Sequence, residues 1–264
     1  MSERKIILVT GGNTGLGLEI VKSLCRSTIS YDIIIGSRTS SNGEAAIAEA
    51  KKAYPSTAST LDTIQIDLAS DDSLKAAMDS ISKSRPHLDI LVNNGGASFD
   101  TQITTGKLGL REAFNASWDT NVSGTHVLTT LAIPLLLKSS DPRLIFVTSG
   151  TSTMTETERF DTEASRRINS SPAAGWPKDA GPNPITAYRS SKAGLNMLMR
   201  EWTRILRNDG VKVWCVSPGF LATGLGGHSA DMLRKVRLLL VVSSIQLTTL
   251  DGRIGALYRR RFHC

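Results

Sequence analysis

The chain has 264 residues, of which 40% are hydrophobic and 21% are charged, a size and composition typical of a single globular α/β domain. Its longest wholly apolar run near the C-terminal end, residues 238–242, is far shorter than the roughly 20 residues of a membrane-spanning helix, so we expect no membrane partner. The formal net charge is +7, but seven of the 31 basic residues follow residue 233 and leave the remainder nearly neutral, which argues against a nucleic-acid partner.

The cysteines, the histidines and the first residues of the chain restrict its class further. The three cysteines and four histidines are scattered, without the close spacing of a zinc site or the even number of a disulfide framework, so we expect neither a metal nor a disulfide. The first five residues lead directly into the apolar residues 6–9 and then into a glycine-rich turn, which leaves no room for a signal peptide. The expected location is the cytoplasm.

Short apolar, β-branched runs alternate along the chain with longer segments of helical character. The predicted strands are residues 6–10, 33–35, 63–66, 88–92, 144–148 and 211–216. The predicted helices are residues 17–26, 43–53, 73–83, 110–137 and 187–207. This alternation predicts a Rossmann-type, doubly wound parallel α/β sheet with helices on both faces, formed by residues 1–264 as one domain. Ligands of such sheets bind beyond the carboxyl ends of the strands.

A glycine-rich turn follows the first predicted strand and opens the first helix. Its sequence is Thr10-Gly11-Gly12-Asn13-Thr14-Gly15-Leu16-Gly17. Glycines allow a tight turn and a close approach of the backbone to a pyrophosphate, which the free N–H groups and positive dipole end of the helix stabilise. Glycine-rich turns also occur for packing reasons, so the turn alone does not decide between the two. The residues expected to contact a cofactor are Gly11, Asn13, Thr14, Gly15, Leu16 and Gly17.

Further motifs follow in chain order, each at the end of a predicted strand or inside a predicted helix. They are Asn93-Asn94-Gly95-Gly96, Asn121 within Asp119-Thr120-Asn121-Val122-Ser123-Gly124, Ser149, Tyr188-Arg189-Ser190-Ser191-Lys192, and Pro218-Gly219-Phe220-Leu221-Ala222-Thr223. Together with the glycine turn, this series resembles the short-chain dehydrogenase/reductase family over residues 4 to about 226. The resemblance implies a nicotinamide cofactor and four catalytic residues, Asn121, Ser149, Tyr188 and Lys192.

The chemistry of hydride transfer gives an independent reason for these residue types. Reduction of a carbonyl builds negative charge on oxygen, which must be hydrogen-bonded and then protonated. Tyr188 can donate the proton, and Lys192, four residues later on the same helical face, can supply the charge that favours the phenolate. By resemblance, Ser149 holds the substrate oxygen and Asn121 positions a water that relays protons. Taken singly, each of these residues could equally be an ordinary packing, capping or surface residue.

The choice of cofactor depends on the end of the second strand. Ser37 and Arg38 stand there with no acidic residue, and the planar Arg38 guanidinium suits the 2′-phosphate of NADPH, with Ser37 and Asn13 within reach. The alternative is that Arg38 is an ordinary surface charge. Asp67 matches the family residue beside the adenine, or caps the next helix. The resemblance implies further cofactor contacts at Asp67, Leu68, Asn94, Gly95, Tyr188, Lys192, Pro218, Gly219, Leu221 and Thr223.

Two segments depart from the pattern of alternating strands and helices. Ser149 and Tyr188 are 39 residues apart, and the intervening insertion, about residues 150–185, resembles that of the carbonyl-reductase branch. The resemblance implies a monomer, because this insertion covers the surface that other members use to form tetramers. Residues 227–264 lack the family's closing motif, which leaves the substrate and the folding of this segment open.

We expect an NADPH-dependent reductase that converts a ketone or aldehyde, as a small-molecule substrate, to an alcohol. The reaction is reversible in principle. Two other functions stay open. One is a regulator or scaffold that binds NADP(H) without turnover. The other is a dehydratase, epimerase or cyclase reaction on the same fold.

Overall fold

The sheet of this protein contains six parallel strands in the order β3-β2-β1-β4-β5-β6, as seen in a computed structural model that describes residues 4–178 and 185–218. The strands are β1 (Lys5–Thr10), β2 (Tyr31–Ser37), β3 (Thr60–Gln65), β4 (Ile90–Asn93), β5 (Arg143–Val147) and β6 (Lys212–Val216). The order reverses between β1 and β4, as in a doubly wound Rossmann sheet. The predicted fold class is therefore confirmed.

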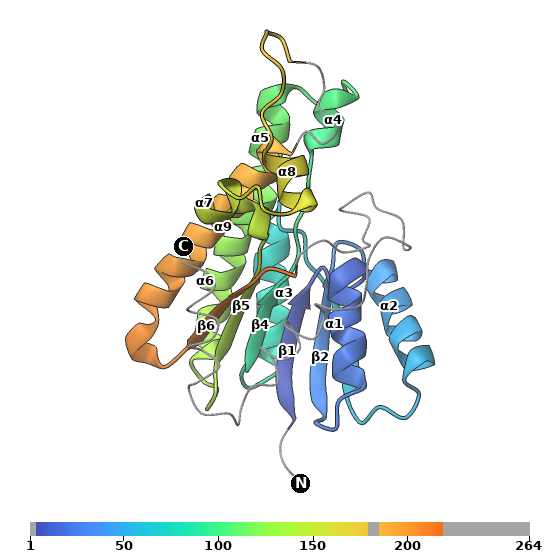
Figure 1. Ribbon diagram of the computed structural model, residues 1–264. Coiled ribbons are helices and arrows are strands. Elements are labelled where there is room, and N and C mark those ends of the chain that lie inside the picture. Colours follow the sequence, from blue (N-terminus) through green and yellow to red (C-terminus); the bar gives the residue numbers. More distant parts are fainter. Residues whose placement is uncertain (1–3, 179–184, 219–264) are drawn as a thin grey trace.

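Helices cover both faces of the sheet (Figure 1). They are α1 (Gly15–Cys25), α2 (Ser40–Ala53), α3 (Asp71–Ser84), α4 (Asp100–Thr104), α5 (Leu110–Trp118), α6 (Gly124–Leu136), α7 (Met154–Thr157), α8 (Glu163–Asn169) and α9 (Thr186–Ile205). Helices α1 and α2 contribute to the core on one face, and α3, α6 and α9 contribute to the core on the other. In the described part of the chain, none of the helices is both long and apolar enough to cross a membrane.

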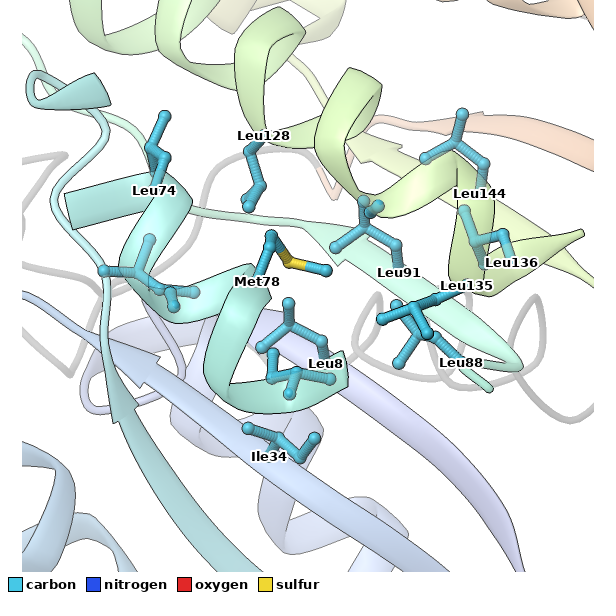
Figure 2. Packing of buried hydrophobic residues seen from close by; sticks show 14 of the residues in the cluster. Leu8, Ile34, Leu74, Met78, Leu88, Leu91, Leu128, Leu135, Leu136 and Leu144 are labelled. Atoms are coloured by element: carbon cyan, nitrogen blue, oxygen red, sulfur yellow. The ribbon is translucent and has the colours of Figure 1, made fainter. Parts of the chain in front are cut away.

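The alternation of side chains along β1 fills both cores. Leu8 packs with α3 and α6, whereas Ile7 and Val9 pack with α1 and α2, and all three side chains are fully buried. Figure 2 shows Met78 of α3 and Leu128 of α6 over the sheet residues Leu8 and Leu91. Burial on both faces explains why β1, β2, β4 and β5 contain short, continuous apolar runs, whereas the edge strand β3 is more polar and partly exposed.

Three predicted boundaries differ from the structure. Strands β2 and β3 extend through the polar residues Asp32 and Asp62, which the apolar pattern missed; both carboxylates accept hydrogen bonds from Arg85, at 3.0 and 3.1 Å. The predicted single helix over residues 110–137 is interrupted by a π-helical turn, Asp119–Ser123 (η1). After this turn Gly124 lies against the backbone of Leu68, where a Cβ atom would approach the Leu68 oxygen to 1.7 Å. These contacts are tertiary and have no local signature.

The predicted insertion forms a short 3₁₀ turn, Gly150–Ser152 (η2), followed by α7 and α8. Figure 1 shows α4, α5, α7 and α8 beyond the carboxyl ends of the strands. The Arg189 guanidinium of α9 donates hydrogen bonds to the Thr151 carbonyl at 2.7 Å and to Asn169 Oδ1 at 2.9 Å. These bonds hold both ends of the segment 151–169 to α9. The predicted contacts Gly219, Leu221 and Thr223, and the C-terminal segment 227–264, lie outside the described residues.

Candidate active site

The turn between β1 and α1 forms a cradle that only glycine backbone permits. Gly11 and Gly15 have φ angles of +60° and +52°, in the left-handed region. A Cβ atom on Gly17 would lie 2.1 Å from the Gly11 oxygen and 2.6 Å from Asn94 Nδ2, so a side chain cannot be accommodated. Thr14 is the N-cap of α1 but makes no capping bond through its side chain, and the first turn holds no acidic residue. A turn of this kind fits the pyrophosphate of a nicotinamide cofactor.

Asn94 supports this cradle from the end of β4. Its amide Nδ2 donates to the Thr10 carbonyl at 2.9 Å and to the Gly11 carbonyl at 3.3 Å. The Thr10 hydroxyl, which is buried, accepts hydrogen bonds from the backbone N–H groups of Asn94 and Gly95 at 3.0 and 2.8 Å. Sequence reasoning missed Thr10. The only signal for it was its position as the last residue of a strand before a glycine turn.

The end of β2 presents polar groups that have no partner among the residues that the structure describes. The Arg38 side chain is exposed, and no hydrogen bond or ion pair holds it among the described residues. The Ser37 Oγ atom is buried and has no hydrogen-bond partner in that part of the chain. Thr39, the N-cap of α2, makes no side-chain capping bond, and the first turn of α2 contains no acidic residue. Asn13 is partly buried on the neighbouring turn.

The hydrogen bonds after β3 rule out one of the two roles predicted for Asp67, the cap of the next helix. The N-cap of α3 is Ser70, whose hydroxyl accepts a hydrogen bond from the Ser73 N–H, so the capping interpretation of Asp67 is wrong. Asp67 Oδ1 instead accepts from the Ala69 N–H at 3.0 Å. The Leu68 side chain is 8% exposed and packs in the core, so its main contacts are with the protein rather than with a ligand.

Helix α9 brings Tyr188 and Lys192 together with Ser149, which follows β5. The Lys192 Nζ atom lies 5.9 Å from the centroid of the Tyr188 ring and donates a hydrogen bond to the Val147 carbonyl at 3.0 Å. The Tyr188 hydroxyl lies close enough to the Ser149 hydroxyl for their interaction to lower the pKa of the phenol. Ser149 also exchanges a 2.8 Å hydrogen bond with the Thr151 hydroxyl. Three polar groups therefore lie together at the carboxyl end of the sheet, Tyr188 and Lys192 as their four-residue spacing predicts and Ser149 as the family resemblance implies.

Burial sets the protonation of these groups. Desolvation raises the pKa of Tyr188 above its usual value, and the hydrogen bond with Ser149 offsets only part of this effect. Desolvation lowers the pKa of Lys192 to about 8, and the neighbouring Cys215 opposes this shift. At neutral pH the phenol is protonated and the lysine is mostly charged. The pair can therefore donate a proton and then stabilise the phenolate that forms.

Asn121 lies in the π-helical turn, fully buried, and joins three elements. Its Oδ1 accepts from the Ala97 N–H at 2.9 Å, and its Nδ2 donates to the Ala97 carbonyl at 2.8 Å and to Ser191 Oγ at 2.9 Å. A Cβ atom on Gly96 would lie 2.8 Å from Asn121 Oδ1 and 3.3 Å from Lys192 Nζ. The second glycine of Gly95-Gly96 thus allows the loop after β4 to pass between Asn121 and Lys192.

Thr148 and Pro218 follow β5 and β6, respectively. The Thr148 hydroxyl donates to Asn196 Oδ1, which ties β5 to α9, so Ser149 is the hydroxyl left beside the tyrosine. Pro218, the last described residue after β6, is buried, as a residue lining the cofactor site would be.

The sequence is similar to those of known dehydrogenases and reductases. The family model described as short chain dehydrogenase matches residues 5–161 and 170–233. The short-chain dehydrogenase/reductase eupG of Phoma sp. is 47% identical over 234 residues, which are 87% of this chain and 82% of the relative. The short-chain dehydrogenase/reductase tropE of Talaromyces stipitatus is 42% identical, over 88% of this chain and 84% of the relative. Carbonyl reductase (NADPH) 1 of Bos taurus is 28% identical, over 87% and 86%.

Solved structures share the fold at lower identity. A metagenomic short-chain oxidoreductase in complex with NADP superposes with a TM-score of 0.66 at 21% identity, covering 93% of this chain and 92% of the other. A 3-oxoacyl-(acyl-carrier protein) reductase of Brucella melitensis in complex with NAD has a TM-score of 0.63 at 23% identity, covering 86% and 78%. Given the family-model match over most of the sequence and relatives above 40% identity, the chain belongs to the short-chain dehydrogenase/reductase family.

Proposed function

We propose that this protein reduces a ketone or aldehyde to an alcohol with NADPH, in a reaction that is reversible in principle. The observation that carries the proposal is the group formed by Ser149, Tyr188 and Lys192 beside a glycine cradle that fits a pyrophosphate. NADPH supplies the hydride when it is bound. The carbonyl substrate is a small molecule whose oxygen lies between the Ser149 and Tyr188 hydroxyls.

The side chains of the protein handle the charge and the proton. Ser149 and Tyr188 donate hydrogen bonds to the carbonyl oxygen, which polarise it as negative charge develops. Tyr188 then transfers its proton to the new alkoxide. The resulting phenolate lies near the buried Lys192 ammonium, whose charge is only weakly screened in this site. We assign Asn121 the role of fixing the Ala97 backbone beside Lys192, and with it the path of a water that returns the proton.

The preference for NADPH over NADH follows from the end of β2. Proteins of this fold occur with NADP and with NAD, so the fold alone does not choose between them. An acidic residue would bind the 2′-hydroxyl of NADH, and Ser37-Arg38 offers a hydroxyl and a guanidinium instead. Both groups lack partners within the described ranges, which supports a phosphate as their ligand. We assign the remaining cofactor contacts to the Gly11–Gly17 turn, Asp67 and Lys192.

We also propose a cytoplasmic monomer with a substrate site like that of carbonyl reductases. The support is that Arg189 fastens the insertion to α9, immediately beside Tyr188. Light scattering tests the oligomeric state. A stable dimer or tetramer would contradict the proposal and would direct attention to Leu110 and Trp118, which are exposed on α5.

The function is tested with a panel of ketones and aldehydes and the purified protein. The absorbance of the reduced nicotinamide is followed with NADPH and with NADH, and NADPH binding is measured separately by its fluorescence. Turnover of at least one carbonyl compound, faster with NADPH, supports the proposal. Tight NADPH binding without turnover across the panel would instead indicate a cofactor-binding regulator.

A further inference from the structure

Helix α9 begins without a local capping group. Its N-cap is Ile185, whose side chain has no acceptor, and its first turn contains no acidic residue. Tyr188 lies in this first turn, at the third helical position. The backbone N–H groups of Ala187 and Tyr188 are among those that an α-helix cannot satisfy internally. The part of the chain that carries the proposed proton donor therefore depends on a partner from elsewhere.

Asp100 is that partner, and it is the first residue of α4, directly after the loop that follows β4. Its Oδ1 atom accepts a hydrogen bond from the Ala187 N–H at 2.8 Å, and its Oδ2 atom accepts one from the Tyr188 N–H at 2.9 Å. The side chain is only 2% exposed, and the Ser98 hydroxyl donates to Oδ2 at 3.2 Å. These are the second and third N–H groups of the helix, which an ordinary N-cap side chain would bind. A carboxylate also suits the positive end of the helix dipole.

The segment from the end of β4 to Asp100 contacts three parts of the candidate site in turn. Asn94 binds the backbone of the glycine cradle, Ala97 pairs with Asn121, and Asp100 binds the first turn of α9. Residues 94–100, the loop after β4 with the first residue of α4, thus connect the cofactor cradle to the proposed proton donor. A change at Asp100 acts on the tyrosine through its backbone and removes no atom that touches the substrate.

We propose that Asp100 is a positioning residue, which holds the first turn of α9 so that the Tyr188 hydroxyl stays beside Ser149 and Lys192. This inference rests on the proposed reductase function, because positioning is defined relative to the proton that Tyr188 donates. The cap binds the Tyr188 backbone directly. Loss of the cap therefore frees the tyrosine while Lys192, a turn further into the helix, keeps its bond to Val147.

The variants Asp100→Ala and Asp100→Asn test the inference, with Asp141→Asn as the matched control. Asp141 is also a carboxylate held by hydrogen bonds, but it lies just before β5, at the end of the strands opposite the site. Using the best carbonyl substrate of the panel, we expect Asp100→Ala to lower kcat roughly 10- to 100-fold, with KM and NADPH affinity little changed. Asp100→Asn keeps one acceptor oxygen and should lose less. Asp141→Asn should keep the wild-type kcat below its melting temperature.

A second substitution separates positioning from general damage to the fold. In a Tyr188→Phe background there is no phenol to position, so Asp100→Ala should change the residual kcat by no more than about twofold. An equal loss in both backgrounds would overturn the inference. An unchanged kcat in Asp100→Ala alone would overturn it as well.

Amide hydrogen exchange tests the cap without any turnover. Asp100→Ala should speed exchange at Ala187 and Tyr188 at least about 10-fold and leave the amides of β5 unchanged. If the wild-type protein reduces no carbonyl compound, the proposed function fails, and the exchange result still decides whether Asp100 caps α9. Unchanged exchange in Asp100→Ala would refute the cap even in an active enzyme.

Discussion

The Tyr188→Phe substitution removes one oxygen atom and leaves the aromatic ring in place. In the structure that oxygen interacts with Ser149, and the Lys192 ammonium lies 5.9 Å from the centroid of the same ring. If it protonates the alkoxide, its loss should lower kcat by roughly 10²–10⁴, the usual contribution of general acid catalysis. This corresponds to about 3–5 kcal/mol in the activation free energy. The lost hydrogen bond should cost no more than about 1 kcal/mol of unfolding free energy.

The expected loss in kcat is much larger than the expected loss in stability, so the experiment separates a catalytic role of the hydroxyl from a structural one. NADPH affinity, measured by fluorescence titration, should stay within about twofold of wild type, because the cofactor contacts are assigned to other residues. Tyr54→Phe is the matched control: it removes the same oxygen from the C-cap residue of α2 and should leave kcat unchanged. Reduction of a good substrate by Tyr188→Phe at the wild-type rate would refute the reasoning, and the proton would then have to come from water or another residue.

Three further predictions concern the cofactor, the pH dependence and the fold. Arg38→Ala should weaken NADPH binding about tenfold and leave NADH binding nearly unchanged. Tenfold is the lower end of the range of losses expected for a charge-assisted hydrogen bond, because Arg38 is exposed. Equal losses for both cofactors would make Arg38 a structural residue. Because burial lowers the pKa of Lys192 to about 8, its positive charge, and with it the rate of carbonyl reduction, should decline as the pH rises through that value; a rate that climbs over this range would contradict the role of the ammonium. Burial disfavours the charged form of Asp141, but hydrogen bonds from Lys212, Lys5 and Arg143 outweigh this effect and hold its pKa below the usual range. Asp141→Asn should therefore lower the free energy of unfolding by about 1–3 kcal/mol at neutral pH. In urea titrations this difference from wild type should shrink once the pH falls below about 4, because wild type then begins to lose the stability contributed by the ionised carboxylate.

The sequence was sufficient wherever the signal is local. Strands β1, β2, β4 and β5 are buried for most of their length, so each contains a short apolar run that can be recognised without a structure. The glycine turn and the four-residue spacing of Tyr188 and Lys192 are likewise local, because they depend on the backbone geometry of one turn and one helix. The strands, the longer helices outside the interrupted segment 110–137 and the proximity of Tyr188 and Lys192 were predicted in this way, whereas the place of Ser149 beside them was implied by the family resemblance.

Tertiary structure decided the features that depend on partners far along the chain. The π-helical turn arises where Asn121 pairs with Ala97, 24 residues away, and the cap of α9 is formed by Asp100, 88 residues from Tyr188. Strands β2 and β3 extend through Asp32 and Asp62 because the distant Arg85 neutralises both carboxylates. A buried polar group needs a partner, and the chain supplies that partner only once it has folded, so the residues that hold the tyrosine in place have no signature in the local sequence.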